Sequence, residues 1–102
     1  MQNQCVLTGQ VVAIEPVRQT PGGVARQRLW LEHRSRQEEA GVARAVEARI
    51  ALILAGDAAI GSAAQVREGS QIQVSGFIAR SGHRGEAQDR LELHVQALVH
   101  LD

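Results

Sequence analysis

Apolar and polar residues alternate through several stretches of this chain, and the alternation predicts β-strands because successive side chains of a strand point to opposite faces. In residues 26–34, Leu29 and Leu31 form an apolar face, while the residues between and beside them form a polar one. Residues 71–79 alternate most strictly, with apolar residues and Gly76 set against glutamine and serine. The predicted strands are residues 4–14, 26–34, 44–54, 71–79 and 91–101.

Some positions within these stretches depart from simple alternation. Residues 44–54 are rich in helix formers, so a helix competes there with the strand that the neighbouring segments favour. Gly9 and Gly76 lie inside predicted strands, where a glycine often marks a bulge or a bend. Residues 57–67 are expected to form a loop or a short helix, and residues 68–70 a turn.

Polar segments connect the predicted strands. Residues 33–39 carry both signs of charge without an apolar face, which predicts a loop or a strand end exposed to solvent. Residues 16–23 contain both prolines and a pair of glycines, so they predict a turn-rich connection that exposes Arg18. Residues 80–90 form an uninterrupted polar loop, whose cationic residues are Arg80, His83, Arg84 and Arg90.

Five strands with two internal glycines and long later loops predict an all-β fold, a five-stranded Greek-key barrel of the OB type, as a single domain over residues 1–102. Such barrels bind oligonucleotides on the face of the second and third strands, helped by the loops after strands one and four. Arg18, Arg34 and residues 80–90 fall on those elements. The positions of the arginines therefore say more about nucleic-acid binding than their number does.

The composition excludes several classes of protein. The chain has 11 basic residues, all arginine, against 11 acidic ones, so a net charge of zero argues against a polycation that binds nucleic acid by bulk attraction. Cys5 is the only cysteine, which excludes an internal disulfide and a cysteine-rich zinc site. No apolar run approaches the roughly 20 residues that span a bilayer, so we expect a cytoplasmic protein without membrane contact.

No constellation of residues predicts an enzyme. His33 has no second histidine at a metal-ligand interval, and nothing in the spacing gives it an acid-base partner. The glycine pairs fail the phosphate-loop pattern, which requires a lysine that this chain lacks. The sequence therefore predicts no catalytic residue, metal or cofactor.

Three segments carry a resemblance to a known family. They are LEHRSRQEEAG at residues 31–41 followed by Arg44, EGSQIQVSGFIA at residues 68–79, and LELHVQAL at residues 91–98. With these the chain resembles the PriB family (primosomal replication protein N), relatives of bacterial single-stranded DNA-binding protein. The resemblance implies a bacterial homodimer that binds single-stranded DNA, links the helicase PriA to DnaT in replication restart, and works beside single-stranded DNA-binding protein.

The resemblance also implies which residues contact DNA. Arg34 and Arg44 match basic positions of the family, and Arg18 matches another in the first loop. Trp30 faces outward beside Arg28, where it could stack on a base. The full set of predicted DNA-binding residues is Arg18, Arg28, Trp30, Arg34, Arg44, Arg80, His83, Arg84 and Arg90.

The chain departs from the family at two positions, and some of the predicted DNA-binding residues have alternative roles. Val42 and Glu47 stand where relatives carry aromatic residues for base stacking, a contact worth roughly 1–3 kcal/mol per base. This loss raises a second hypothesis, a protein-interaction module that stimulates the helicase and binds DNA weakly. Arg34 and Arg44 could instead form surface salt bridges, and Trp30 could belong to the core or to a dimer interface.

Two further apolar residues have simpler predicted roles. Phe77 is predicted to be part of the core, and Cys5 a small buried hydrophobe.

Overall fold

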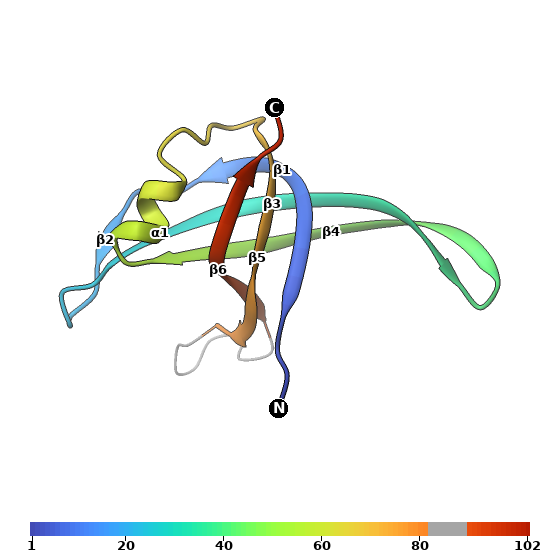
Figure 1. Cartoon of the computed structure of the whole chain (residues 1–102), viewed down its shortest axis with the longest axis horizontal. Helices are drawn as coiled ribbons and strands as arrows, with labels where there is room; N and C mark the ends of the chain where they lie inside the picture. Colours follow the sequence, from blue (N-terminus) through green and yellow to red (C-terminus); the bar gives the residue numbers. More distant parts are fainter. Residues whose placement is uncertain (82–89) are drawn as a thin grey trace.

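The computed structural model describes residues 1–81 and 90–102 and shows an all-β barrel with one short helix (Figure 1). Each predicted strand is present, and the segment that could have been a helix is a strand. A two-residue strand in the first loop adds to the prediction. The elements are β1 (Cys5–Ile14), β2 (Arg18–Gln19), β3 (Ala25–Glu39), β4 (Val42–Ala55), α1 (Asp57–Ser62), β5 (Gln71–Arg80) and β6 (Leu91–His100).

The strands form a closed barrel. Their order is β1-β5-β6-β4-β3-β2, and a further pairing of β1 with β3 joins the two sides of the sheet. All neighbouring pairs run antiparallel except β4 and β6, which pair in parallel over a short stretch. Because β1, β3, β4, β5 and β6 are the strands of an OB barrel, the predicted fold class is confirmed.

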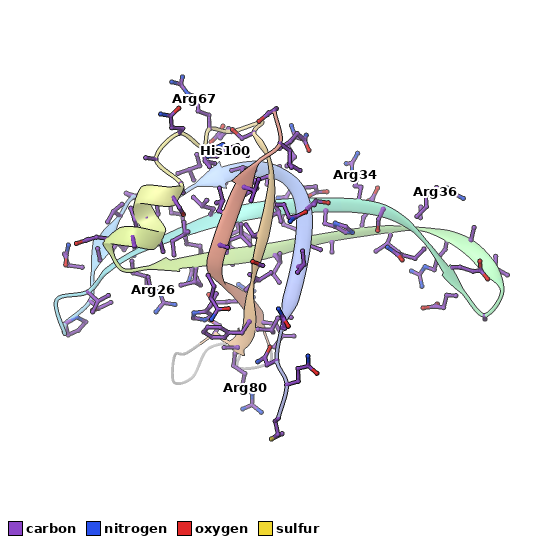
Figure 2. The ribbon with its side chains drawn as sticks, viewed as in Figure 1. Arg26, Arg34, Arg36, Arg67, Arg80 and His100 are labelled. Carbon is purple, nitrogen blue, oxygen red and sulfur yellow. The ribbon has the colours of Figure 1, made fainter. Side chains whose placement is uncertain are left out.

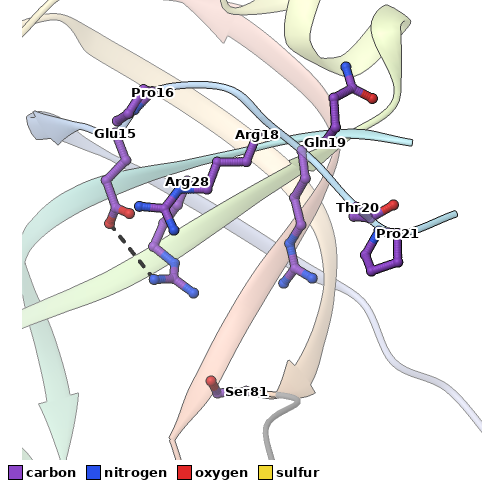
Figure 3. A pocket seen from close by; sticks show the side chains of 9 residues that line it. Glu15, Pro16, Arg18, Gln19, Thr20, Pro21, Arg28 and Ser81 are labelled. Carbon is purple, nitrogen blue, oxygen red and sulfur yellow. Dashed lines mark ion pairs between the residues drawn. The ribbon is translucent and has the colours of Figure 1, made fainter. Parts of the chain in front are cut away.

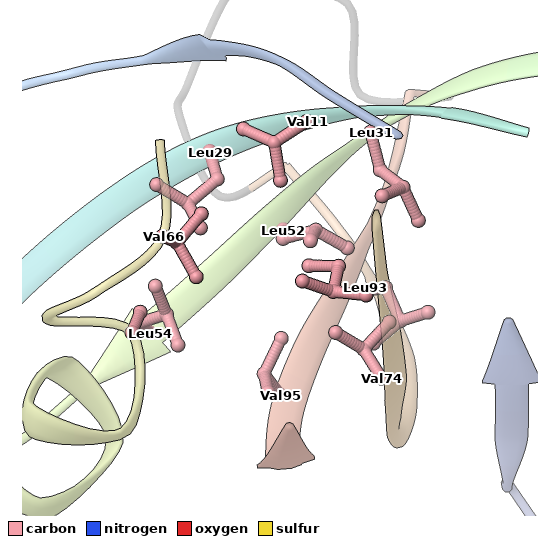
Figure 4. Packing of buried hydrophobic residues seen from close by; sticks show 11 residues of the cluster. Val11, Leu29, Leu31, Leu52, Leu54, Val66, Val74, Leu93 and Val95 are labelled. Carbon is pink, nitrogen blue, oxygen red and sulfur yellow. The ribbon is translucent and has the colours of Figure 1, made fainter. Parts of the chain in front are cut away.

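The core lies inside the barrel and under α1 (Figure 4). Leu29 and Leu31 of β3 are 1% and 0% exposed, which confirms the apolar face that the alternation predicts. Cys5 is half-buried and packs against this cluster. The buried cluster consists of Val11, Leu29, Leu31, Leu52, Leu54, Ala63, Val66, Ile72, Val74, Leu93 and Val95.

The two strand glycines lie where backbones approach closely. A Cβ on Gly76 would lie 1.8 Å from the His94 carbonyl oxygen, and the β5–β6 register shifts between Ser75 and Gly76, which confirms the irregularity predicted there. A Cβ on Gly9 would lie 2.4 Å from a backbone oxygen of β3. The bulge of β1, however, lies between Val11 and Ala13, so Gly9 allows a close approach rather than a bulge.

β3 and β4 extend beyond the barrel as a long two-stranded hairpin, the arm on the right of Figure 1. Residues 33–39, predicted to be a loop or a strand end, instead pair with β4 along their whole length. A loop is avoided because Ala40 and Gly41 have φ of 55° and 76°, which closes the tight two-residue turn that antiparallel strands favour. Backbone pairing with β4 therefore holds residues 33–39 in a strand, although they have no apolar face to bury.

Two side chains on the outward face of the barrel, Glu92 and Phe77, are partly or fully buried, and Phe77 differs from its predicted place in the core. Glu92, on the face of β6 opposite Leu93, is only 2% exposed, because Arg28 and Arg26 of β3 cover it. Phe77, expected in the core, is half-buried outside the core cluster and stacks on His94 with ring centroids 4.9 Å apart. Packed side chains therefore also lie on the outside of β3, β5 and β6.

Candidate nucleic-acid interface

A pocket with a cavity volume of about 320 Å³ lies between the first loop, β3 and the end of β5 (Figure 3). Its position matches the OB face and loops that the sequence analysis singles out. Arginines dominate its charged lining, and Glu15 is the one acid among the residues that line it in the described chain. The lining residues are Glu15, Pro16, Arg18, Gln19, Thr20, Pro21, Arg26, Arg28 and Ser81.

The strand pairing brings the pocket's arginines together. Arg18 of β2 is the direct cross-strand partner of Arg26 of β3. Arg28 follows two residues later on the same strand, so it projects from the same face. Three guanidinium groups thus converge on one cavity, although like charges opposite each other across a strand pair are unfavourable.

Two carboxylates hold Arg26 and Arg28. Buried Glu92 lies 3.2 Å from Nη2 of Arg28 and 3.6 Å from Nη2 of Arg26. Glu15 lies 3.8 Å from Nη1 of Arg28, the contact drawn in Figure 3. Nε of Arg28 is buried and donates to no acceptor in the described chain. The side chains of Arg26 and Arg28 remain 41% and 37% exposed, so part of each guanidinium faces the pocket.

Trp30 lies beside this site on the outward face, as the alternation predicts. Its Nε1 donates a hydrogen bond of 2.8 Å to Glu15, the same carboxylate that pairs with Arg28. The side chain is half-buried and is absent from the core cluster. The core alternative for Trp30 is therefore wrong, and base stacking stays a prediction.

His94 of β6 is a second half-buried side chain near the arginines of β3. Across the sheet, Ile53 is paired with Arg28 on one side and His94 on the other, and it is 1% exposed. Burial lowers the pKa of His94 below the ordinary histidine value; the Glu92 carboxylate raises this pKa and the Arg26 guanidinium lowers it. His94 is thus disposed to be neutral beside the arginine pair.

The hairpin arginines form ion pairs with glutamates of the same hairpin. Arg34 lies 3.8 Å from both Glu32 and Glu47, and Arg44 lies 2.9 Å from Glu39. These are the salt bridges that the sequence analysis gives as the alternative role for both arginines. Arg34 is on the arm, away from the end of the barrel that carries Arg26 (Figure 2). DNA contact by Arg34 and Arg44 therefore stays a prediction.

His33 has a structural role where the arm leaves the barrel. One ring nitrogen, Nδ1, lies 2.7 Å from the carbonyl oxygen of Thr8, and Nε2 lies 2.8 Å from Oγ of Ser35. The ring thus joins β1 to β3 at the point where their pairing ends. In the described part of the chain, no group of three or more histidine, cysteine or acidic residues is placed to hold a metal.

The remaining predicted contacts belong to the last loop. Arg80 ends β5 and Arg90 precedes β6, and both are exposed at the same end of the barrel (Figure 2 labels Arg80). The N–H of Ser81 donates to the carbonyl oxygen of Arg90 over 2.8 Å, which holds the two ends of the loop together. His83 and Arg84 lie outside the described residues.

Sequence reasoning missed two members of this site, Arg26 and Glu92. Alternation alone placed Arg26 at the edge of the second strand, on the same face as Arg28. That spacing could have indicated it. Nothing in the sequence indicated that Glu92 is buried, because its neighbours on β6 alternate like those of a solvent-exposed glutamate.

Comparison with known proteins places the chain in a family. The family described as another single-strand binding protein family matches residues 3–97. The replication restart protein PriB of Vibrio vulnificus is 38% identical over 99% of this chain and 100% of its own length. The chain belongs to the PriB family. PriB of Yersinia enterocolitica is also similar, at 34% identity over 98% of this chain and 93% of the relative.

Solved structures agree with the PriB fold. PriB from Ralstonia solanacearum has a TM-score of 0.79 at 28% identity, covering 98% of both chains. The single-stranded DNA-binding protein from Thermus aquaticus has a TM-score of 0.77 at 26% identity, and this chain covers 50% of it. These are names of binding proteins rather than of enzymes. No helix in the described part of this PriB-family chain is long and apolar enough to cross a membrane.

Proposed function

We propose that this chain binds single-stranded DNA without sequence preference and acts as an accessory protein in replication restart. The observation that carries the proposal is the pocket in which Arg18, Arg26 and Arg28 converge on the face that OB barrels use for oligonucleotides. Guanidinium groups bind phosphate through charge-assisted hydrogen bonds that carry no sequence information. The DNA backbone passes through this pocket and continues toward Arg80 and Arg90 at the loop ends.

The other predicted contacts contribute around this path. Trp30 offers its indole to a base next to the pocket, and His83 and Arg84 extend the basic loop. Arg34 and Arg44 bind phosphate by exchanging their glutamate partners for it. Such exchange costs little, because exposed ion pairs contribute only about 0–1 kcal/mol each.

The test is a fluorescence-anisotropy titration of labelled oligothymidine with the full chain at low and near-physiological salt. We expect salt-sensitive binding, because each neutralised phosphate of a single strand contributes about 0.7 to the slope of log affinity against log salt. A path that contacts three phosphates, one each at the pocket, Arg80 and Arg90, therefore gives a slope near −2, on this estimate. Binding that is undetectable at low salt, or insensitive to salt, contradicts the proposal.

Single substitutions locate the binding surface. Arg18→Ala is expected to weaken oligothymidine binding by about tenfold, as expected for a charge-assisted hydrogen bond of roughly 1.5–3 kcal/mol. Arg34→Ala is expected to weaken it less, because Arg34 first has to leave its glutamates. Arg67→Ala is the matched control, since Arg67 is exposed at the far end of the barrel (Figure 2) and outside the pocket. Equal losses from all three variants contradict this location.

A second candidate function is a protein-interaction module that stimulates the helicase PriA and links it to DnaT, with DNA binding secondary. The observations that favour it are the glutamate-paired arginines of the hairpin and the net charge of zero. Replacing Arg34 and Arg84 by alanine discriminates between the candidates. Helicase stimulation that survives a loss of DNA affinity favours the interaction module; loss of both together favours DNA binding as the main function.

We also propose that the functional unit is a homodimer joined through β1. Residues 5–9 pair with β5 on one side, and no described strand pairs with their other edge. Exposed apolar side chains include Val6 of β1 at 58% and, across β5 from β1, Val99 at 52% and Leu101 at 55%. An open strand edge next to apolar residues is suited to pairing with the same strand of a second copy.

A further inference from the structure

The pocket contains a pair of like charges without a described counter-ion between them. Arg18 and Arg26 are direct partners across β2 and β3, an arrangement that is destabilising in isolation. Arg26 has Glu92 at 3.6 Å, whereas Arg18 forms no ion pair with any described residue. An anion bound in the cavity would relieve this repulsion. The arrangement therefore points to a ligand with a compact negative charge.

Glu92 is placed to prepare the arginines for that ligand. Its side chain is 2% exposed, and it reaches Arg26 and Arg28 of β3 from β6, across β4. Arginine loses about 2 kcal/mol of rotamer entropy when its side chain is fixed, so a guanidinium that is already held binds phosphate more tightly. Glu92 fixes two such groups and leaves part of each in the pocket.

We propose that this pocket binds one phosphate group and that Glu92 is the positioning residue that orients Arg26 and Arg28 toward it. The inference rests on the proposed DNA-binding function and deepens it. Three guanidinium charges against Glu15 and Glu92 leave one net positive charge at the site, which matches a phosphodiester. In this chain the pocket is therefore a principal DNA contact, alongside the hairpin positions of the family.

The competing role for Glu92 is simple neutralisation, in which it weakens DNA binding by cancelling arginine charge. The two roles predict opposite signs for Glu92→Gln. If Glu92 only neutralises the arginines, its replacement removes one negative charge and tightens binding. If Glu92 positions, its replacement releases both arginines and weakens binding despite the removed negative charge.

The experiment compares Glu92→Gln with Glu68→Gln in the oligothymidine titration over a range of salt concentrations. Glu68→Gln makes the same change in net charge at an exposed residue outside the pocket, so it reports the bulk effect of charge. We expect Glu92→Gln to weaken binding about tenfold and to reduce the salt slope by about 0.7, the loss of one phosphate contact. Binding by Glu92→Gln as tight as that of Glu68→Gln overturns the inference.

Arg26→Ala, which leaves Glu92 in place, keeps the test valid if Glu92→Gln folds poorly. Arg26 is 41% exposed, so its truncation leaves the core intact, and circular dichroism checks each variant. We expect Arg26→Ala to weaken binding about as much as Glu92→Gln, and the double variant Arg26→Ala/Glu92→Gln to weaken it little further, because both changes disrupt the same phosphate site. Unchanged binding by Arg26→Ala, or fully additive losses, overturns the inference. Absence of binding by the unaltered chain instead overturns the proposed function.

Two sources of phosphate share this chemistry, the DNA backbone and a terminal phosphomonoester. Oligothymidines of one length with a 5′-phosphate, a 3′-phosphate or hydroxyl ends separate them. Equal affinities that all fall in Arg26→Ala assign the pocket to the backbone. Tighter binding of one phosphorylated end, lost in Arg26→Ala, assigns it to that end. Affinities that do not respond to Arg26→Ala for any oligonucleotide contradict a phosphate site.

Discussion

Burial disfavours a charged imidazole at His94, and this predicts a pH dependence of stability. Because its pKa is lower in the folded chain than the ordinary value of about 6.5, the unfolded chain binds a proton more readily. The free energy of unfolding should therefore be highest above about pH 7. It should decrease as the pH falls through 6.5 toward the pKa of His94 in the folded chain. Urea denaturation between pH 5.5 and 8 measures this decrease.

His94→Gln is the variant for that prediction. It removes the titrating group, so the stability lost between pH 7 and 5.5 should be smaller than in the unaltered chain. His100→Gln serves as the control, because His100 is exposed on the same strand. An unaltered slope in His94→Gln would show that another group titrates in this range.

At the same scale, Glu92 marks the limit of reading faces from alternation. The pattern assigned it correctly to the face opposite Leu93, but an outward side chain is solvent-exposed only when nothing covers it. Two arginines from β3 cover Glu92, and they come from a strand more than sixty residues earlier in the chain. A buried charge that depends on such distant partners leaves no local signal, whereas the exposed face of Arg28 and Trp30 could be predicted.

Among the elements, β5 depends on the absence of a side chain at one position. A Cβ on Gly76 would overlap the backbone oxygen of His94 at 1.8 Å, and a backbone atom has little freedom to move away. Gly76→Ala should therefore lower the free energy of unfolding by about 3 kcal/mol or more, the upper range for overpacking. Thermal or urea unfolding measures the change.

Gly61→Ala is the matched control for this substitution. Gly61 lies in α1, and a Cβ there would meet no heavy atom within 4 Å. Alanine favours a helix over glycine by up to about 1 kcal/mol, so this variant should be as stable as the unaltered chain or slightly more so. Similar destabilisation by both variants would contradict the argument for Gly76.

The β3–β4 hairpin shows that a polar composition can conceal how far a strand extends. Residues 33–39 lack an apolar face, and the sequence interpretation therefore ended the strand too early. On the arm both faces are exposed, so the strand is specified by cross-strand pairing and by the turn at Ala40 and Gly41. Alternating hydrophobicity reports burial, and it fails for a strand that leaves the core.

For the whole molecule, barrel closure was predictable and the arginine pocket was predictable in part. The barrel follows from five alternating strands whose apolar faces have to be buried together, and that pattern is local and repeated. The pocket depends on where the first loop packs, because only the β2–β3 pairing brings Arg18 opposite Arg26. Loop placement has no such repeated signal.

The molecule's outer surface leads to a final prediction, on its assembly. If two copies pair through β1, a charge at Val6 is forced into the interface, where burying it without a partner is costly. Val6→Arg should raise the dimer dissociation constant by at least about tenfold, equivalent to 1.4 kcal/mol. Val42→Arg is the control, because Val42 is equally apolar and 65% exposed at the tip of the arm. Sedimentation equilibrium measures both; a monomeric unaltered chain, or an unchanged dimer in Val6→Arg, contradicts pairing through β1.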